Sequence, residues 1–154
     1  MHAKFMQEAL RLAHQAKHYG EVPVAAIITN QYGQIIAKAH NLTKQGKNPL
    51  HHAEMRVIGD ACARLASERL VNCDLYVTLE PCAMCAAAIS HARLRRLIFA
   101  AYDIKGGAVE HGSRWFTQPT CHHVPEIIGG IQEEPARLLL QAFFQERRKQ
   151  VIQR

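Results

Sequence analysis

Two stretches of this sequence decide how the chain folds: His52-Ala53-Glu54 and Pro81-Cys82-Ala83-Met84-Cys85. One imidazole and two thiolates are ligand types that a tetrahedral zinc site prefers. Three protein donors leave the fourth position to water, and zinc lowers the pKa of a bound water from ~15.7 toward ~7. The motifs therefore predict a zinc ion held by His52, Cys82 and Cys85, with a hydroxide available at neutral pH.

Glu54 follows the predicted histidine ligand by two residues. A hard carboxylate beside a sulfur-rich site is interpreted as a proton carrier for general acid–base catalysis, not as a fourth ligand. The residues around Glu54 open a helix predicted over residues 53–66, and the two cysteines open another, predicted over 83–92. A helix N-terminus carries free N–H groups and partial positive charge, which favour thiolate over thiol. Two helix starts are therefore expected to face one metal ion.

Other interpretations of the cysteines and histidines stay open. Cys82 and Cys85 could instead form a thioredoxin-like redox pair, but such a pair needs neither the upstream His-x-Glu nor the proline before Cys82. The motifs could also form a structural zinc site, but such a site usually has four protein ligands. His51 could compete as a ligand, but only His52 stands two residues before Glu54. Cys121-His122-His123 could indicate a second metal site, although a loop that shapes a substrate groove or contacts another subunit fits three adjacent donors better.

Length and composition limit the class of protein. With 154 residues, of which 48% are hydrophobic, residues 1–154 are expected to form one domain. The net charge of +6 suits a polyanionic partner. The sequence lacks an apolar run of the ~18 residues that a membrane span needs, and it lacks a secretory h-region, so we expect a cytoplasmic protein with no membrane contact. Five cysteines, two of them assigned to zinc, fit a reducing compartment better than a disulfide framework.

The hydrophobic pattern predicts alternating helices and strands. Helices are predicted over residues 3–17, 53–66, 83–92 and 135–150, and strands over 22–29, 34–39, 74–79 and 95–101. The first two strands should form a hairpin, and the strand–helix–strand unit that follows is typical of parallel strands joined by a crossover. Residues 102–125 form a long irregular stretch, which is more often functional than idle. The pattern predicts an α/β fold.

The same motifs resemble a known family. His-x-Glu followed by Pro-Cys-x-x-Cys is similar to the signature of the zinc-dependent deaminases. Further blocks occur in the same order as in bacterial tRNA-specific adenosine deaminases: Glu21-Val22-Pro23-Val24-Ala25-Ala26, Asn41, Leu75-Tyr76-Val77-Thr78-Leu79-Glu80, Asp103-Ile104-Lys105-Gly106, and Phe143-Phe144 with Arg147-Arg148. The resemblance covers nearly the whole chain. It implies a three-layer α/β/α cytidine-deaminase-like fold with a mixed central sheet of about five strands.

The resemblance also implies a function. It implies hydrolytic deamination of adenosine to inosine at the wobble position of a tRNA anticodon, with one zinc ion per subunit, Glu54 as proton shuttle and no organic cofactor. The implied partners are the tRNA anticodon loop and a second subunit, in a homodimer whose second copy lines part of the groove. The implied substrate-binding residues are Asn41, Ala53, Asp103, Lys105, Phe144 and Arg147. Ordinary structural roles stay open for them, such as a polar loop position for Asn41 and packing for Phe144.

Two residues depart from the family pattern, and two other functions stay open. Ala25 stands where glycine is common, which would narrow the base pocket, and Tyr102 stands where arginine is common, which would remove a phosphate contact. One alternative function is a zinc-dependent deaminase of a free nucleobase or nucleoside such as cytosine, cytidine or guanine. A small neutral base gains little from a basic surface, which argues against it. The other is a non-catalytic zinc-dependent RNA-binding module, whose RNA binding would survive the loss of Glu54.

Overall fold

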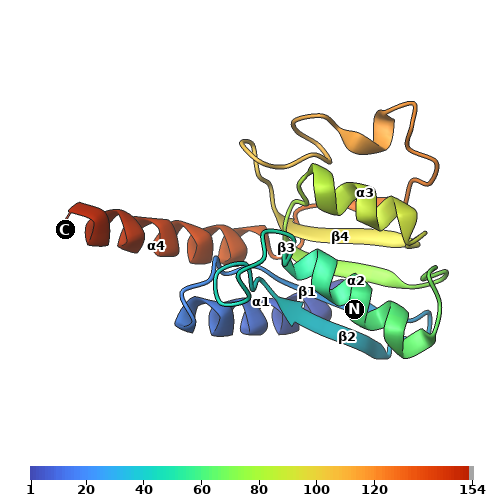
Figure 1. The fold of residues 1–154 in the computed structure, drawn as a ribbon, viewed down its shortest axis with the longest axis horizontal. Helices are drawn as coiled ribbons and strands as arrows, with labels where there is room; N and C mark the ends of the chain where they lie inside the picture. Colours follow the sequence, from blue (N-terminus) through green and yellow to red (C-terminus); the bar gives the residue numbers. More distant parts are fainter. Residues whose placement is uncertain (153–154) are drawn as a thin grey trace.

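The computed structural model describes residues 1–152, and its strands form one mixed sheet (Figure 1). Within those residues the sheet has five strands: β1 Ala25–Thr29, β2 Ile35–His40, β3 Asp74–Leu79, β4 Arg96–Ala101 and β5 Glu126–Ile128. Their order across the sheet is β2-β1-β3-β4-β5. β1 is antiparallel to both of its neighbours, whereas β3, β4 and β5 are parallel to one another. β2 and β3 therefore point the same way, and their carboxyl ends reach the same edge of the sheet.

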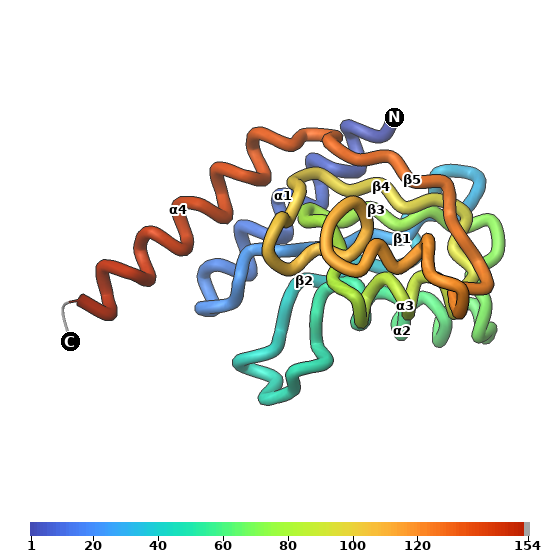
Figure 2. The backbone as a smooth tube through the Cα atoms, turned by 90° about the horizontal axis from the view of Figure 1, so that it is seen from above, coloured from blue at the N-terminus to red at the C-terminus, as the bar shows by residue number. Residues whose placement is uncertain are grey.

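Helices cover both faces of this sheet. The α-helices of the described residues are α1 His2–His18, α2 Ala53–Leu65, α3 Ala83–His91 and α4 Glu133–Ile152, and a 3₁₀ turn spans Trp115–Thr117. α1 and α4 lie on one face, and α2 and α3 lie on the other (Figure 2). The carboxyl-terminal half of α4 extends beyond the sheet (Figure 1). The predicted three-layer α/β/α fold is confirmed.

Burial explains the apolar pattern of the strands. All five residues of β1 are buried, and β3 and β4 have only one partly exposed residue each, because both faces of these central strands are covered by helices. On α1, apolar side chains recur at three- and four-residue steps and form the buried face that packs on the sheet. The core therefore lies in two layers, one on each side of the sheet.

Four predicted details differ from the structure. The first strand begins at Ala25, not near residue 22, because Pro23 has no N–H and the Val24 N–H bonds to the Val22 carbonyl instead of a neighbouring strand. The hydrophobic pattern of the helix predicted over residues 53–66 places Val57, Ile58, Ala61, Cys62 and Leu65 on its buried face. Leu65 is instead 43% exposed, because α2 ends there and the next residue turns into the left-handed region. Ile58 and Cys62 of the same helix are only half-buried. The sequence predicts no strand at β5, because a three-residue, partly exposed edge strand carries no period.

The longest helix in the described range, α4, has 20 residues, and charged side chains are spread along it. Across residues 1–152, the structure contains no helix that is both long enough and apolar enough to cross a bilayer.

Leu97 in β4 tests this account of the core. Leu97→Ala should lower the free energy of unfolding by about 2–5 kcal/mol, since it leaves a cavity between the sheet and its helices. Leu138→Ala on α4 is the matched control, because Leu138 is 49% exposed and its loss should cost less than about 0.5 kcal/mol. Urea denaturation measures both, and equal losses would contradict the assignment of the core.

Candidate metal centre and substrate groove

The N-termini of α2 and α3 meet at the carboxyl edge of the sheet. β2 is followed by a loop and then α2, and β3 is followed by a short turn and then α3. Because β2 and β3 run in the same direction, both helices begin at that edge. His52 and Cys82 are the residues immediately before the two helices, each with extended backbone. Cys85 lies in the first turn of α3, so both cysteines and the histidine face one region.

Three potential metal donors converge there. The Nδ1 atom of His52 lies 3.6 Å from the Sγ atom of Cys82 and 3.5 Å from that of Cys85. Zinc ligands at ~2.3 Å for sulfur and ~2.0–2.1 Å for nitrogen stand roughly 3.6 Å apart at a tetrahedral angle, so the spacing suits zinc. In the part of the chain that the structure describes, this is the one set of three His, Cys, Asp or Glu donors that gathers within 4.8 Å.

Hydrogen bonds among the three donors shift the pKa of each of them. A hydrogen bond from Cys85 lowers the pKa of Cys82 to about 4, with a further contribution from His52. The same bond, together with burial, raises the pKa of Cys85. The bond to Cys82 also raises the pKa of His52. One thiolate is therefore already favoured, and thiolate is the form that binds metals.

Glu54 is buried beside these donors. It is the second residue of α2, and only 4% of it is exposed. Burial raises the pKa of its carboxyl group to about 6, and the nearby Cys82 thiolate adds to the effect. It stands outside the group of three close donors, and a carboxyl group with a pKa near neutrality can both accept and release a proton.

Asn41, the residue after β2, contacts Ala53, the first residue of α2. The Oδ1 atom of Asn41 accepts a hydrogen bond from the backbone N–H of Ala53 at 3.1 Å. This contact satisfies one of the N–H groups that a helix start leaves free, and it holds the first turn of α2 beside His52. Both residues are predicted substrate contacts, and in this structure the Asn41 side chain and the Ala53 N–H bind each other.

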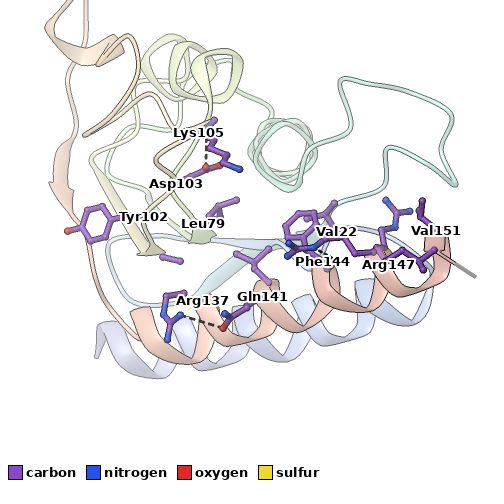
Figure 3. A pocket seen from close by; sticks show the side chains of 15 residues that line it. Val22, Leu79, Tyr102, Asp103, Lys105, Arg137, Gln141, Phe144, Arg147 and Val151 are labelled. Carbon is purple, nitrogen blue, oxygen red and sulfur yellow. Dashed lines mark hydrogen bonds between the residues drawn. The ribbon is translucent and has the colours of Figure 1, made fainter.

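The other four predicted substrate contacts line one groove. It has a volume of about 1090 Å³ and lies between α4 and the loop that follows β4 (Figure 3). Asp103 and Lys105 come from the loop, and Phe144 and Arg147 from α4. Phe144 is 43% exposed, whereas its neighbour Phe143 is buried, as expected for adjacent residues of a helix. The groove thus combines an exposed aromatic ring with several cations: Lys105, Arg137, Arg147 and Arg148.

The groove and the metal donors are neighbouring but separate features. The lining of the groove does not include His52, Cys82 or Cys85 among the residues described. Leu79, the last residue of β3, does line it, three residues before Cys82. The turn at residues 80–82 therefore connects the wall of the groove to the donors.

The two departures from the family pattern differ in their position relative to the groove: Ala25 is buried away from it, whereas Tyr102 lines it. Ala25 is fully buried in β1, where its N–H donates to Thr78 Oγ1 at 3.1 Å. Tyr102 is one of the residues that line the groove (Figure 3), and its ring packs edge-on against Phe99, with centroids 5.1 Å apart. Tyr102 therefore both packs against the sheet and borders the groove in this structure.

Sequence reasoning missed two buried glutamates, Glu21 and Glu80. The carboxylate of Glu21 accepts the backbone N–H groups of Lys44 at 2.7 Å and Gln45 at 3.0 Å. Burial alone would raise the pKa of Glu80, but hydrogen bonds, led by those from Asp103 and His111, lower it overall. A charged residue at the end of an apolar strand is a signal that could have drawn attention to Glu80.

The segment Cys121-His122-His123 is tied to the end of α3. His123 Nε2 contacts the Leu94 carbonyl oxygen at 2.6 Å, and Ser90 Oγ donates to the His123 carbonyl oxygen at 2.8 Å. The three residues form no metal-donor cluster among the described residues. Their role in this structure is to connect the long loop to the helix.

This fold, with donors at paired helix starts, belongs to a known class. The sequence model of the cytidine and deoxycytidylate deaminase zinc-binding region matches residues 1–101. The chain belongs to the cytidine and deoxycytidylate deaminase family. A guanine deaminase from Nitrosomonas europaea, 23% identical, shares the fold with a TM-score of 0.77 over 90% of this chain and 81% of that one.

Within the family, near relatives carry the name tRNA-specific adenosine deaminase. The protein of that name from Agrobacterium fabrum is 50% identical over 144 residues, covering 94% of each chain. The one from Bacillus subtilis is 41% identical, covering 94% of this chain and 89% of its own. A structure from a study of A-to-I editing by tRNA:A34 deaminases is 50% identical and superposes with a TM-score of 0.87, covering 89% of this chain and 99% of that one.

Asn41→Ala tests the cap on α2. Losing the acceptor for the Ala53 N–H should lower the free energy of unfolding by about 0.5–2 kcal/mol, the usual cost of a lost helix cap. Asn41→Asp keeps an acceptor oxygen in place and should recover most of that loss. Thermal unfolding of both variants measures the effect, and the cap assignment fails if aspartate is no better than alanine.

Proposed function

We propose that this protein is a zinc-dependent deaminase that converts adenosine to inosine at the wobble position of a tRNA anticodon. The observation that carries the proposal is the placement of three zinc-type donors and a buried glutamate next to a groove with cations and an exposed aromatic ring. The relatives named tRNA-specific adenosine deaminase support the choice of substrate.

The proposed metal is one zinc ion per chain, held by His52, Cys82 and Cys85. The sulfur and nitrogen donors and their spacing support zinc over a hard cation such as magnesium, which takes oxygen ligands. When bound there with an open position, zinc supplies a Lewis acid that lowers the pKa of water from ~15.7 toward ~7.

Glu54 carries the protons in the proposed reaction. Its carboxylate takes a proton from the attacking water and delivers it to N1 of the adenine ring. The remaining proton of that water, now on the C6 hydroxyl, passes through the same carboxyl group to the amino group at C6. The C6–O bond forms, the C6–N6 bond breaks, and ammonia leaves inosine behind. Burial of Glu54 supports this role because it raises the pKa of the carboxyl group to about 6.

The groove is proposed to hold the anticodon loop around the target base. The target base must leave its stack to reach a pocketed metal, and loop bases do so at low cost. Phe144 offers a ring for stacking, Lys105 and Arg147 offer charge to phosphates, and Asp103 holds the turn that carries Lys105. Asn41 and Ala53 are proposed to bind the nucleoside near the metal.

We further propose that residues 1–154 act as one domain, that two copies pair, and that the enzyme works in the cytoplasm, where tRNA is found. The single continuous sheet of residues 1–152 supports the first proposal. Exposed apolar side chains such as Ile104, next to the groove, support a partner surface.

Removing one donor tests the metal centre. Cys82→Ala should reduce the zinc content of the purified protein from one ion per chain to nearly none, because two remaining donors bind zinc weakly. Cys121→Ala is the matched control, since Cys121 lies outside the donor cluster, and it should keep its zinc. Elemental analysis measures both; zinc retained by the Cys82 variant would refute the ligand set.

Glu54→Ala tests the reaction and its substrate together. The wild type should produce inosine in transcribed tRNA and release little ammonia from free adenine, cytosine or guanine. Glu54→Ala should keep zinc and lose about 10²- to 10⁴-fold in turnover, the typical contribution of a positioned acid–base group. Glu68→Ala, at an exposed glutamate, is the control and should keep wild-type turnover. Faster turnover of a free base than of tRNA would favour the alternative deaminase.

A further inference from the structure

Glu80 is a buried carboxylate that the proposed reaction does not use. It follows β3 directly, and its side chain is 0% exposed. Its two oxygens accept five hydrogen bonds, and every donor comes from one segment of the loop after β4. The donors are the backbone N–H groups of Asp103 at 3.0 Å, Val109 at 3.2 Å, Glu110 at 2.9 Å and His111 at 3.2 Å, and the Nδ1 atom of His111 at 2.8 Å.

This arrangement fixes the shape of the loop. A carboxylate is buried at tolerable cost only when its oxygens are hydrogen-bonded, so residues 103–111 must keep the conformation that supplies those donors. The loop also passes closely over the carboxylate: a Cβ atom added at Gly107 would lie 2.5 Å from the Glu80 Cδ atom. We call residues 103–111 the groove loop.

The groove loop forms one wall of the groove and is joined to the metal-bearing turn. Asp103 and Lys105 line the groove. The N–H of Ala108 donates to the carbonyl oxygen of Pro81 at 2.8 Å, and Pro81 directly precedes Cys82. The loop is therefore fixed to the same short turn, residues 80–82, that carries a proposed zinc ligand.

We propose that Glu80 is a positioning residue for RNA recognition: it holds the groove loop in the shape that presents Asp103 and Lys105 to the substrate, at a set distance from the metal centre. This inference rests on the proposed function, since it takes the groove to be the RNA site. Glu80 acts before binding, so the RNA meets a wall that is already ordered and the cost of ordering it does not weaken binding.

Asp74, the first residue of β3, is a buried carboxylate with a purely structural role. It lies at the opposite end of β3, is also buried, and accepts two hydrogen bonds from Arg95 at 2.8 and 2.7 Å. Neither Asp74 nor Arg95 lines the groove. Asp74 therefore provides a matched control for loss of a buried carboxylate.

Glu80→Gln is the first test. A carboxamide has one acceptor oxygen, and its NH₂ group would face backbone N–H donors. For an anticodon stem–loop RNA we expect KM to rise about tenfold, the order expected when hydrogen bonds to a charged acceptor are lost. The kcat and the zinc content should change little. Asp74→Asn should lower the unfolding temperature and leave KM unchanged.

Gly107→Ala is the second test, because it displaces the groove loop without altering the carboxylate. It should raise KM in the same way as Glu80→Gln. Gly59→Ala is the control, since a Cβ at Gly59 on α2 meets no atom within 4 Å and should leave KM unchanged. This pair decides the question if the Glu80 variant does not fold.

Hydrogen exchange on the wild-type enzyme is the third test and needs no variant. The amides of Asp103, Val109, Glu110 and His111 should be protected in the free protein, before RNA is added. Rapid exchange of these amides in the free protein would overturn the inference, as would an unchanged KM in a folded Glu80→Gln or Gly107→Ala variant. A wild type that leaves the RNA unedited would refute the proposed function instead.

Discussion

The site depends on one geometric constraint, the arrival of two helix starts at the same edge of the sheet. β2 and β3 run in the same direction with β1 between them, so the helices that follow them both begin at their carboxyl ends. One helix start carries a histidine and the other carries two cysteines, and this places three donors within 4.8 Å although they come from segments about thirty residues apart in sequence. The partial positive charge of both helix starts favours the thiolate form that a metal needs.

Three buried polar side chains hold the loops around this edge. Glu21 binds the loop between β2 and α2 through the N–H groups of Lys44 and Gln45, Asn41 binds the first turn of α2, and Glu80 binds the groove loop. In each case a buried side-chain acceptor binds backbone N–H groups of a neighbouring segment. The loop after β4 supplies Asp103 and Lys105 to the groove, and these hydrogen bonds hold it in place.

The sequence predicted the elements that have a short-range period and the contacts that a motif marks. The helices and four strands followed from short-range periods, and the donor triplet followed from two motifs about thirty residues apart, which the structure brings together as expected. The five bonds to Glu80 span 23 to 31 residues of sequence, so no short-range pattern reveals them. β5 is a comparable case, because its three residues become a strand only through pairing with β4.

The half of α4 that extends beyond the sheet allows the length of the groove to change. The buried residues of α4 end at Phe143, and most of the residues that follow, up to Ile152, are exposed. Nucleating a helix costs free energy, whereas propagating it costs little. Because the packed half of α4 already forms the nucleus, each later turn only propagates an existing helix. Adding or removing a turn at this end would therefore alter the length of the groove wall while leaving the hydrophobic layers untouched.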